Sequence, residues 1–181
     1  MCVFVNPLTR RSLTYPLMVT IETQVERTPV RRYNYAAQLR PRGDNLLQIE
    51  KRHIDDMTAH ALEDDPDECC GILAGKGETI SRLYRITNTA RSPTRYLMDP
   101  KEQLSADRDA DLHADEFLAF YHSHTHSPAY PSQTDVRMAV DSGWLEVYYL
   151  LISLEDKSSP QVRAFHITAS GEIVEEDYKV I

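Results

Sequence analysis

The chain is poor in cysteine, with three in 181 residues. Two of them, Cys69 and Cys70, are neighbours and are poorly placed to bridge each other, while Cys2 stands far away. Such a set cannot build the disulfide framework of a small secreted domain, and it fits a reducing compartment. A hydrophobic run of the roughly 20 residues needed to span a bilayer is also missing. We therefore expect a cytoplasmic protein with no membrane partner.

Basic charge is scarce outside the first 45 residues. Residues 1–45 carry seven arginines and three acidic residues, whereas the rest of the chain has 13 basic and 25 acidic residues. A domain with this acidic balance is a poor partner for the phosphate backbone of a nucleic acid. We expect no nucleic-acid partner, and we expect the arginine-bearing start of the chain to be a solvated extension.

Helical periodicity is absent from residues 1–45, which four prolines interrupt. This segment is predicted to be an N-terminal extension that is flexible or partly ordered. Residues 46–181 are enough for one domain with a sizeable core. The expected boundary therefore lies at residue 45, between the extension and a single main domain.

Three segments of the main domain have the patterns of helices. The first, over residues 51–63, has apolar residues at the i, i+3, i+7 and i+8 positions of an amphipathic helix: Ile54, Met57, Ala61 and Leu62. Asp99, with Pro100 after it, is typical of a helix start, and that helix is expected to run to about residue 114. A third helix is predicted over residues 134–141.

Short apolar or β-branched runs predict the strands. These runs are residues 46–49, 69–74, 79–86, 117–121, 147–153, 162–167 and 172–178. Gly75, Lys76 and Gly77 are expected to form the hairpin turn between the second and third strands. Helices and strands in this mixed order predict an α/β (α+β) fold around one sheet.

Two histidines stand two residues apart directly after the strand at 117–121. Because side chains at i and i+2 of a strand project from one face, His122 and His124 can reach one ion, with Ser123 turned away. A loop with two prolines then folds the chain back, so Asp135 arrives on the next helix as an anionic third ligand. Two imidazoles and one carboxylate suit zinc better than magnesium or calcium, which prefer oxygen alone. Three such ligands leave a fourth position open for water, as in catalytic zinc sites.

The same residues allow simpler interpretations. Ser132 and Asp135 also fit a helix capping box, which needs no metal. A His-x-His pair alone often occurs by chance. Cys69 and Cys70 could bind metal, but cysteines in an apolar strand are more often buried structural residues. The remaining histidines are interpreted as loop, structural or surface residues: His53, His60, His113, His126 and His166.

A larger pattern resembles the JAMM (MPN-plus) metalloprotease family. Its parts are a glutamate in a Glu-x-x-Gly strand, a His-x-His pair and a Ser-x-x-Asp segment: Glu68, Gly71, His122, His124, Ser132 and Asp135. The resemblance extends from about Leu46 to the C-terminus and leaves residues 1–45 uncovered. It implies a single MPN-type domain with a curved mixed sheet flanked by helices, similar to cytidine deaminases. Residues 88–94, 102–104 and 129–132 are similar to a bacterial branch of the family that includes sulfur-carrier-protein–cysteine peptidases.

The resemblance implies a role for each of these polar residues. His122, His124 and Asp135 would bind one Zn²⁺ per chain. Glu68 would be the general acid/base, and Ser132 would help to stabilise the oxyanion. Many members of the family have proline after the second histidine, where this chain has threonine. The bacterial relatives tolerate threonine there, and the chain keeps every ligand that non-catalytic MPN scaffolds lack.

By the same resemblance, the chain is expected to be a zinc metallopeptidase. It would hydrolyse a peptide or isopeptide bond after the C-terminal Gly-Gly of a small ubiquitin-like sulfur-carrier protein, for example releasing cysteine from the carrier in cysteine biosynthesis. A second hypothesis is a deubiquitinase-like isopeptidase that removes a ubiquitin-like modifier from lysines of target proteins. A third, of another class, is a zinc-containing module that binds such a carrier without cleaving it. The oligomeric state stays open, a homodimer included.

Overall fold

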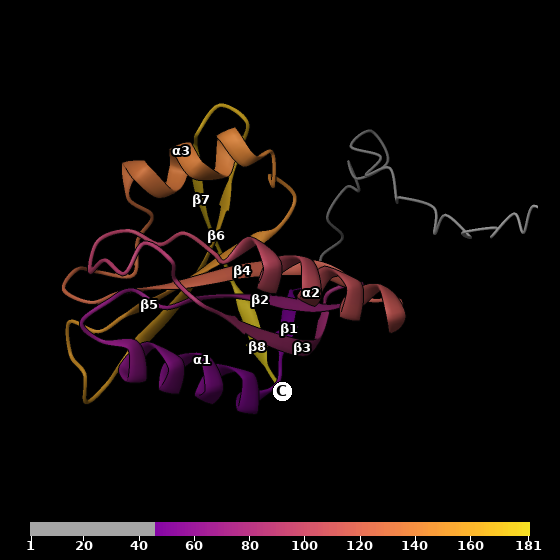
Figure 1. Cartoon of the computed structure of the whole chain (residues 1–181), viewed down its shortest axis with the longest axis horizontal. Coiled ribbons are helices and arrows are strands. Elements are labelled where there is room, and N and C mark those ends of the chain that lie inside the picture. Colours follow the sequence, from indigo (N-terminus) through magenta and orange to yellow (C-terminus); the bar gives the residue numbers. More distant parts are fainter. Residues whose placement is uncertain (1–45) are drawn as a thin grey trace, which may run out of the picture. The chain divides into compact units, whose positions relative to one another are not determined.

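The computed structural model describes residues 46–181. The extension predicted for residues 1–45 lies outside the described residues, and the domain boundary at residue 45 stays a prediction. Figure 1 shows the helices and strands of the described part. The helices are α1 (Lys51–Asp64), α2 (Pro100–Leu112) and α3 (Gln133–Ser142). The strands are β1 (Leu47–Ile49), β2 (Cys70–Lys76), β3 (Thr79–Ile86), β4 (Glu116–His124), β5 (Tyr148–Ser153), β6 (Gln161–Ile167), β7 (Ile173–Glu176) and β8 (Tyr178–Val180).

These strands form one mixed sheet in the order β7-β6-β5-β4-β2-β3-β1-β8. β1 is parallel to β3 and β8, β4 is parallel to β5, and the other neighbours are antiparallel. β7 and β8 lie at opposite ends of this order although only Asp177 separates them in the sequence. The sheet must therefore curl until its ends approach, and the Tyr178 hydroxyl of β8 donates to the Val162 carbonyl of β6 at 3.1 Å. The predicted curved, mixed sheet is confirmed.

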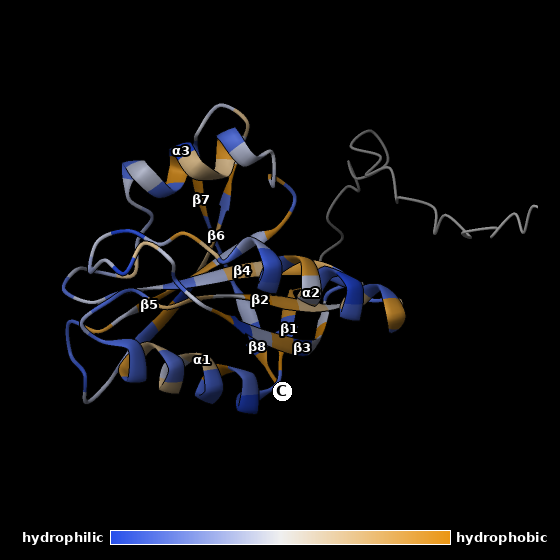
Figure 2. Ribbon diagram, viewed as in Figure 1, coloured by the Kyte–Doolittle hydropathy of each residue, from blue (hydrophilic) through white to orange (hydrophobic). Residues whose placement is uncertain are grey.

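Helices cover both faces of the sheet, with α1 on one face and α2 and α3 on the other (Figure 1). Successive side chains of β4 alternate between the two cores. Ala119 and Tyr121 belong to the core that α1 covers, whereas Phe120 belongs to the core that α2 and α3 cover. The helices carry both hydrophilic and hydrophobic colours, as amphipathic helices do (Figure 2). Each fully buried leucine or isoleucine in these cores stabilises the fold by about 1.5–3 kcal/mol.

The start of α2 is built as its sequence predicts. The Asp99 carboxylate accepts hydrogen bonds from the backbone N–H groups of Lys101 and Glu102, and Pro100 is the first helical residue. The helix ends at Leu112, slightly before the predicted end, because Ala114 adopts a left-handed φ of 53°. Among residues 46–181, no helix has both the length and the apolarity to cross a membrane.

The buried stripe of α1 differs in part from the prediction. Met57 and Ala61 are fully buried, as expected. Leu62 is 42% exposed, so its assignment to the apolar stripe is wrong. It lies about 100° around the helix from Ala61, outside the face that meets the sheet. His53 and His60 complete the buried stripe, in agreement with a structural role for both histidines.

Two details of the predicted strands are also wrong. The turn after β2 consists of Gly77 and Glu78, because the strand continues through Lys76. Gly75 lies inside β2 at a bulge, where a Cβ atom would collide with the Thr79 carbonyl oxygen, while Gly77 supplies the φ of 60° that the turn requires. The single strand predicted over residues 172–178 is two strands, β7 and β8, since the chain crosses there from one end of the sheet to the other.

The neighbouring cysteines point into different cores. Cys69 packs on the α1 side and Cys70 on the side of α2 and α3, and both are buried and free. Burial raises the pKa of the Cys69 thiol to about 12, and it also raises the pKa of Cys70 far above its ordinary value. Such thiols are poor nucleophiles and poor metal ligands, which agrees with a structural role.

Candidate metal centre

The two histidines of the His-x-His pair are the last residues of β4 to face α3. His122 and His124 are both buried, and their Nε2 atoms lie 3.2 Å apart. Ser123, between them, points to the other face, where its Oγ accepts a hydrogen bond from the Cys69 backbone N–H at 2.8 Å. β4 lies inside the sheet, between β2 and β5, so the backbone that carries this pair is held from both sides.

Asp135 reaches the pair from the first turn of α3. Its Oδ2 atom lies 3.5 Å from His122 Nε2 and 3.4 Å from His124 Nε2. The same oxygen accepts a hydrogen bond from the Ser132 backbone N–H at 2.7 Å, and Ser132 Oγ accepts one from the Asp135 N–H at 3.2 Å. This is a complete capping box. The capping box therefore does not exclude the predicted ligand role of Asp135, because its carboxylate also faces the two histidines.

The three inward atoms form a nearly equilateral triangle with edges of 3.2, 3.4 and 3.5 Å. A tetrahedral zinc ion with bonds of 2.0–2.1 Å places its ligands about 3.3–3.4 Å apart. The described residues hold this group of metal-ligating side chains with all three members buried. The triangle therefore has the size and donor types that fit a tetrahedral cation.

The hydrogen bonding of the two rings differs. His124 Nδ1 lies 2.9 Å from the Pro128 carbonyl oxygen. Because a carbonyl only accepts, Nδ1 carries the proton, and in the neutral ring Nε2 presents its lone pair to the triangle. His122 Nδ1 is buried and has no hydrogen-bond partner among residues 46–181.

Electrostatics keep the carboxylate of the triangle ionised. Burial alone would raise the pKa of Asp135, but the adjacent His122 and His124 rings outweigh burial and hold this pKa far below its usual range. Burial lowers the pKa of His122. Burial also acts to lower the pKa of His124, but the Asp135 carboxylate and the Pro128 carbonyl raise it on balance.

Glu68 lies beside the triangle, just before β2. Cys70 of β2 is paired with His122, so two residues further along the antiparallel register Glu68 stands opposite His124. The Glu68 side chain is buried, and burial raises its pKa to about 7, with a lowering effect of His124 and a raising effect of Asp135. A carboxyl group with a pKa near neutrality can both take and return a proton.

Ser132 is exposed at the N-terminus of α3. Its Oγ acts as an acceptor in the capping box, so its hydroxyl hydrogen is not used by that bond. The structure thus places a hydroxyl donor one helical turn from the carboxylate of the triangle. His126 is exposed in the loop after β4 and does not join the triangle, as expected for a loop residue.

Two residues next to the triangle, Tyr96 and Asn88, were not predicted from the sequence to contribute to the site. The ring of Tyr96 stacks on His122, with centroids 4.5 Å apart and planes at 28°. Asn88 donates from Nδ2 to the Glu68 carbonyl at 2.8 Å. Residues 88–94 had carried part of the family resemblance, but no periodicity or spacing connects this loop with β4.

A model of the prokaryotic homologues of the JAB domain matches residues 50–168. The chain belongs to this family. The resemblance to JAMM proteins that the sequence motifs carried is thereby confirmed. The match covers the whole triangle and Glu68, and among the strands and helices of residues 46–181 it leaves β1, β7 and β8 outside.

Individual relatives support the same assignment. The CysO-cysteine peptidase of Mycobacterium tuberculosis is 39% identical over 139 residues, which cover 75% of this chain and 92% of that peptidase. The desampylase of Haloferax volcanii is 35% identical over 106 residues, covering 55% of this chain and 74% of the desampylase. A solved structure of a Desulfitobacterium hafniense protein has 35% identity and a TM-score of 0.66, and the match covers 74% of this chain and 92% of that one.

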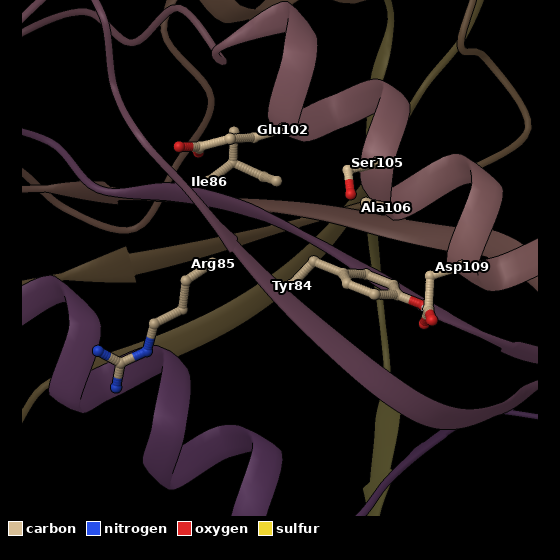
Figure 3. Close-up of a pocket in the computed structure, with 7 residues that line it drawn as sticks. All are labelled: Tyr84, Arg85, Ile86, Glu102, Ser105, Ala106 and Asp109. Atoms are coloured by element: carbon tan, nitrogen blue, oxygen red, sulfur yellow. The ribbon is translucent and has the colours of Figure 1, made fainter.

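A groove separate from the triangle runs between β3 and α2 (Figure 3). It has a volume of about 470 Å³. The residues that line it are Tyr84, Arg85, Ile86, Glu102, Ser105, Ala106 and Asp109. The Tyr84 hydroxyl donates to Asp109 at 2.8 Å across it. β1 pairs with β3 at Thr79 alone, so the rest of this edge of β3 has no strand partner among residues 46–181.

Proposed function

We propose that this JAB-family chain is a zinc metallopeptidase that hydrolyses a peptide or isopeptide bond after the C-terminal Gly-Gly of a small ubiquitin-like sulfur carrier. The observation that carries the proposal is the buried triangle of His122, His124 and Asp135, with Glu68 beside it. Three ligands leave one vertex of a tetrahedron for water or substrate, which is the pattern of a catalytic zinc site.

In this proposal His122, His124 and Asp135 hold one Zn²⁺. When bound, the ion supplies a Lewis acid for the scissile carbonyl and makes water a stronger nucleophile near neutral pH. Glu68 takes a proton from the attacking water and then returns it to the leaving amine, a cycle that a pKa near 7 favours. The Ser132 hydroxyl donates a hydrogen bond to the oxyanion and so acts as an oxyanion-hole donor.

The choice of substrate rests on the relatives and on the family resemblance. The M. tuberculosis relative is named for a bond between CysO and cysteine, and residues 88–94, 102–104 and 129–132 resemble the branch that acts on sulfur carriers. We therefore infer that a carrier–cysteine adduct is the first substrate to test. Its cleavage would take place in the cytoplasm and would serve cysteine biosynthesis. A second candidate is a lysine isopeptide, which the likeness to a desampylase favours.

The groove beside β3 offers a place for an extended carrier tail. A peptide can add to a free strand edge through backbone hydrogen bonds. Ile86 at the end of the groove is paired with Cys70, which in turn is paired with His122. The groove therefore ends two strand spacings, about 9–10 Å, from the triangle, a short distance for a Gly-Gly terminus.

Mass spectrometry of defined conjugates tests the proposed function. The zinc-loaded chain is incubated with a carrier–cysteine adduct and with a carrier–lysine isopeptide, each with and without chelator. We expect free carrier ending in Gly-Gly from the cysteine adduct, and none after chelation. Cleavage of the lysine conjugate alone would favour the second candidate. Binding of carrier with no product from either conjugate would replace the peptidase by a non-catalytic zinc-containing module.

A further inference from the structure

The two histidines of the triangle are oriented by different means. A histidine that binds a metal almost always donates its second ring N–H to a carboxylate, a carbonyl or water, and this bond fixes the orientation of the ring. His124 obeys this rule through the Pro128 carbonyl, at 2.9 Å. The buried Nδ1 of His122 has no such partner among the side chains and backbone of residues 46–181. A different contact reaches the His122 ring from the protein.

That contact is the ring of Tyr96. The two rings stack with centroids 4.5 Å apart and an interplanar angle of 28°. Tyr96 is only 8% exposed and belongs to the core that α2 and α3 cover. We propose that Tyr96 is the positioning residue of His122. Its flat ring fixes the orientation of the His122 imidazole, as the hydrogen bond to the Pro128 carbonyl fixes that of His124. This inference rests on the proposed function, since it takes His122 to be a metal ligand.

Tyr96 can position a ring only if its own backbone is fixed, and one side chain fixes it. The Asn88 amide binds the backbone on both sides of Tyr96: Nδ2 donates to the Arg95 carbonyl at 3.1 Å, and Oδ1 accepts from the Leu97 N–H at 2.9 Å. The same Nδ2 donates to the Glu68 carbonyl at 2.8 Å. Asn88 is buried, so solvent does not compete strongly for these bonds.

The loop of residues 88–98 therefore connects the proposed base with the proposed ligand. Besides the Asn88 bonds, the Ser92 carbonyl accepts from the Glu68 N–H at 2.9 Å. The Pro93 carbonyl accepts from Thr125 Oγ1, next to His124, at 3.2 Å. Glu68, His122 and the segment after His124 thus all contact one loop, which adds to the sheet in fixing their relative positions.

A purely structural Tyr96 would fill space in the core and nothing more. The two roles separate when side chains of similar bulk but different shape are compared. Tyr96→Phe keeps the flat ring, Tyr96→Leu and Tyr96→Met keep apolar volume without it, and Phe120→Leu removes a ring from the same core without touching His122. Phe120 lies two residues before His122 on β4 and contacts Phe117, Trp144 and Tyr149.

Titration of the metal-free full chain with Co²⁺ tests the inference. The visible absorption of the bound ion reports the ligand arrangement, and thermal unfolding in chelator reports the stability of each variant. We expect Tyr96→Leu and Tyr96→Met to bind Co²⁺ roughly 10- to 100-fold more weakly, the usual effect of losing a group that orients a ligand. Their spectra are expected to change, whereas Tyr96→Phe and Phe120→Leu keep the affinity and spectrum of the parent.

Three results would overturn the inference. The first is parent-like Co²⁺ binding by Tyr96→Leu and by Tyr96→Met, so that the test does not depend on one variant folding. The second is an equal loss of affinity in Phe120→Leu, which would make general core stability the cause. The third is a parent chain that binds no Co²⁺, and this result alone would also remove the proposed function.

Discussion

Two histidine–aspartate clusters with buried histidines lie on opposite sides of β4, one on each face of the sheet, and Asp64 of the first is partly exposed. On the α1 face, His60 has its Nδ1 2.8 Å from the Tyr121 hydroxyl and its Nε2 3.3 Å from Asp64. On the other face, the Nε2 atoms of His122 and His124 lie 3.2 Å from each other and share the Asp135 oxygen. Tyr121 belongs to the first cluster and His122 to the second, and the two residues are neighbours in the sequence.

The two clusters differ in how the ring nitrogens of their histidines are engaged. Both ring nitrogens of His60 have partners in the protein, and the cluster has nothing left to offer an ion. In the triangle, two ring nitrogens and a carboxylate oxygen from three residues lie within 3.2–3.5 Å of one another. A buried histidine next to an aspartate is therefore weak evidence for a metal site, and the convergence of three potential ligand atoms is stronger evidence.

Removal of the proposed base should give the largest difference between the two faces. Glu68→Gln is expected to lower turnover of the carrier–cysteine adduct by about 10²- to 10⁴-fold, the usual contribution of a general acid/base. Metal content should stay at the parent level, because Glu68 is not one of the triangle ligands. The matched change on the α1 face, Asp64→Asn, should leave turnover close to that of the parent. Near-normal turnover in Glu68→Gln would remove this residue from the mechanism.

Loss of the Ser132 hydroxyl should come next. Ser132→Ala is expected to lower kcat by roughly 10²- to 10³-fold if the hydroxyl stabilises the oxyanion. The same change also removes the cap of α3, at about 1 kcal/mol, whereas glycine at an N-cap costs only a few tenths of that. Steady-state kinetics of Ser132→Ala and Ser132→Gly separate the effects. Equal losses of kcat indicate the oxyanion role, and a much milder loss in the glycine variant would indicate the helix cap.

The stability of metal-free protein should depend on pH through Glu68. Burial raises the pKa of this carboxyl from 4.5 to about 7, so between these values the folded chain binds more protons than the unfolded chain. The contribution of Glu68 to stability is then fully present below pH 4.5 and is lost as the pH rises through 7, by at most about 3 kcal/mol. Denaturant unfolding in chelator should show Glu68→Gln gaining on the parent across this window. A constant difference between the two proteins from pH 5 to pH 8 would contradict the buried, uncharged glutamate.

The α1 face should respond in stability only. Tyr121→Phe removes the hydroxyl beside His60 Nδ1 and should lower the free energy of unfolding by about 1–2 kcal/mol. Zinc affinity and turnover should stay at parent values, although the change stands next to His122. Calorimetry together with a zinc titration checks this. A loss of zinc affinity in this variant would mean that the two clusters are coupled through β4.

The sequence predicts the parts of this arrangement that follow from local periodicity. His122 and His124 share a face because strands alternate, and Asp135 comes near because a capping box and a proline-bearing loop fix the start of α3. The strands and helices were found with small errors at their ends. Gly75 was misassigned to the turn because the sequence does not show why a glycine is needed. Gly75 allows a close approach of the backbone at Thr79, whereas Gly77 supplies the positive φ of the turn.

What the sequence could not predict depends on contacts between distant segments. The position of Glu68 was assigned by resemblance, and only the register of β2 on β4 gives it a physical basis. Tyr96 and Asn88 lie in a loop whose path is set by hydrogen bonds to Glu68 and not by any repeating pattern. His60 and His122 cannot be told apart by residue type alone, since each is a buried histidine in a regular element.

Metal content of the full chain tests the central claim most directly. The parent, His122→Ala and His60→Gln are loaded with zinc, dialysed and measured by elemental analysis against protein concentration. The convergence of three potential ligand atoms predicts one zinc ion per chain in the parent and in His60→Gln, and a clear loss of zinc in His122→Ala. A parent without stoichiometric zinc, or a loss in His60→Gln equal to that in His122→Ala, would contradict it.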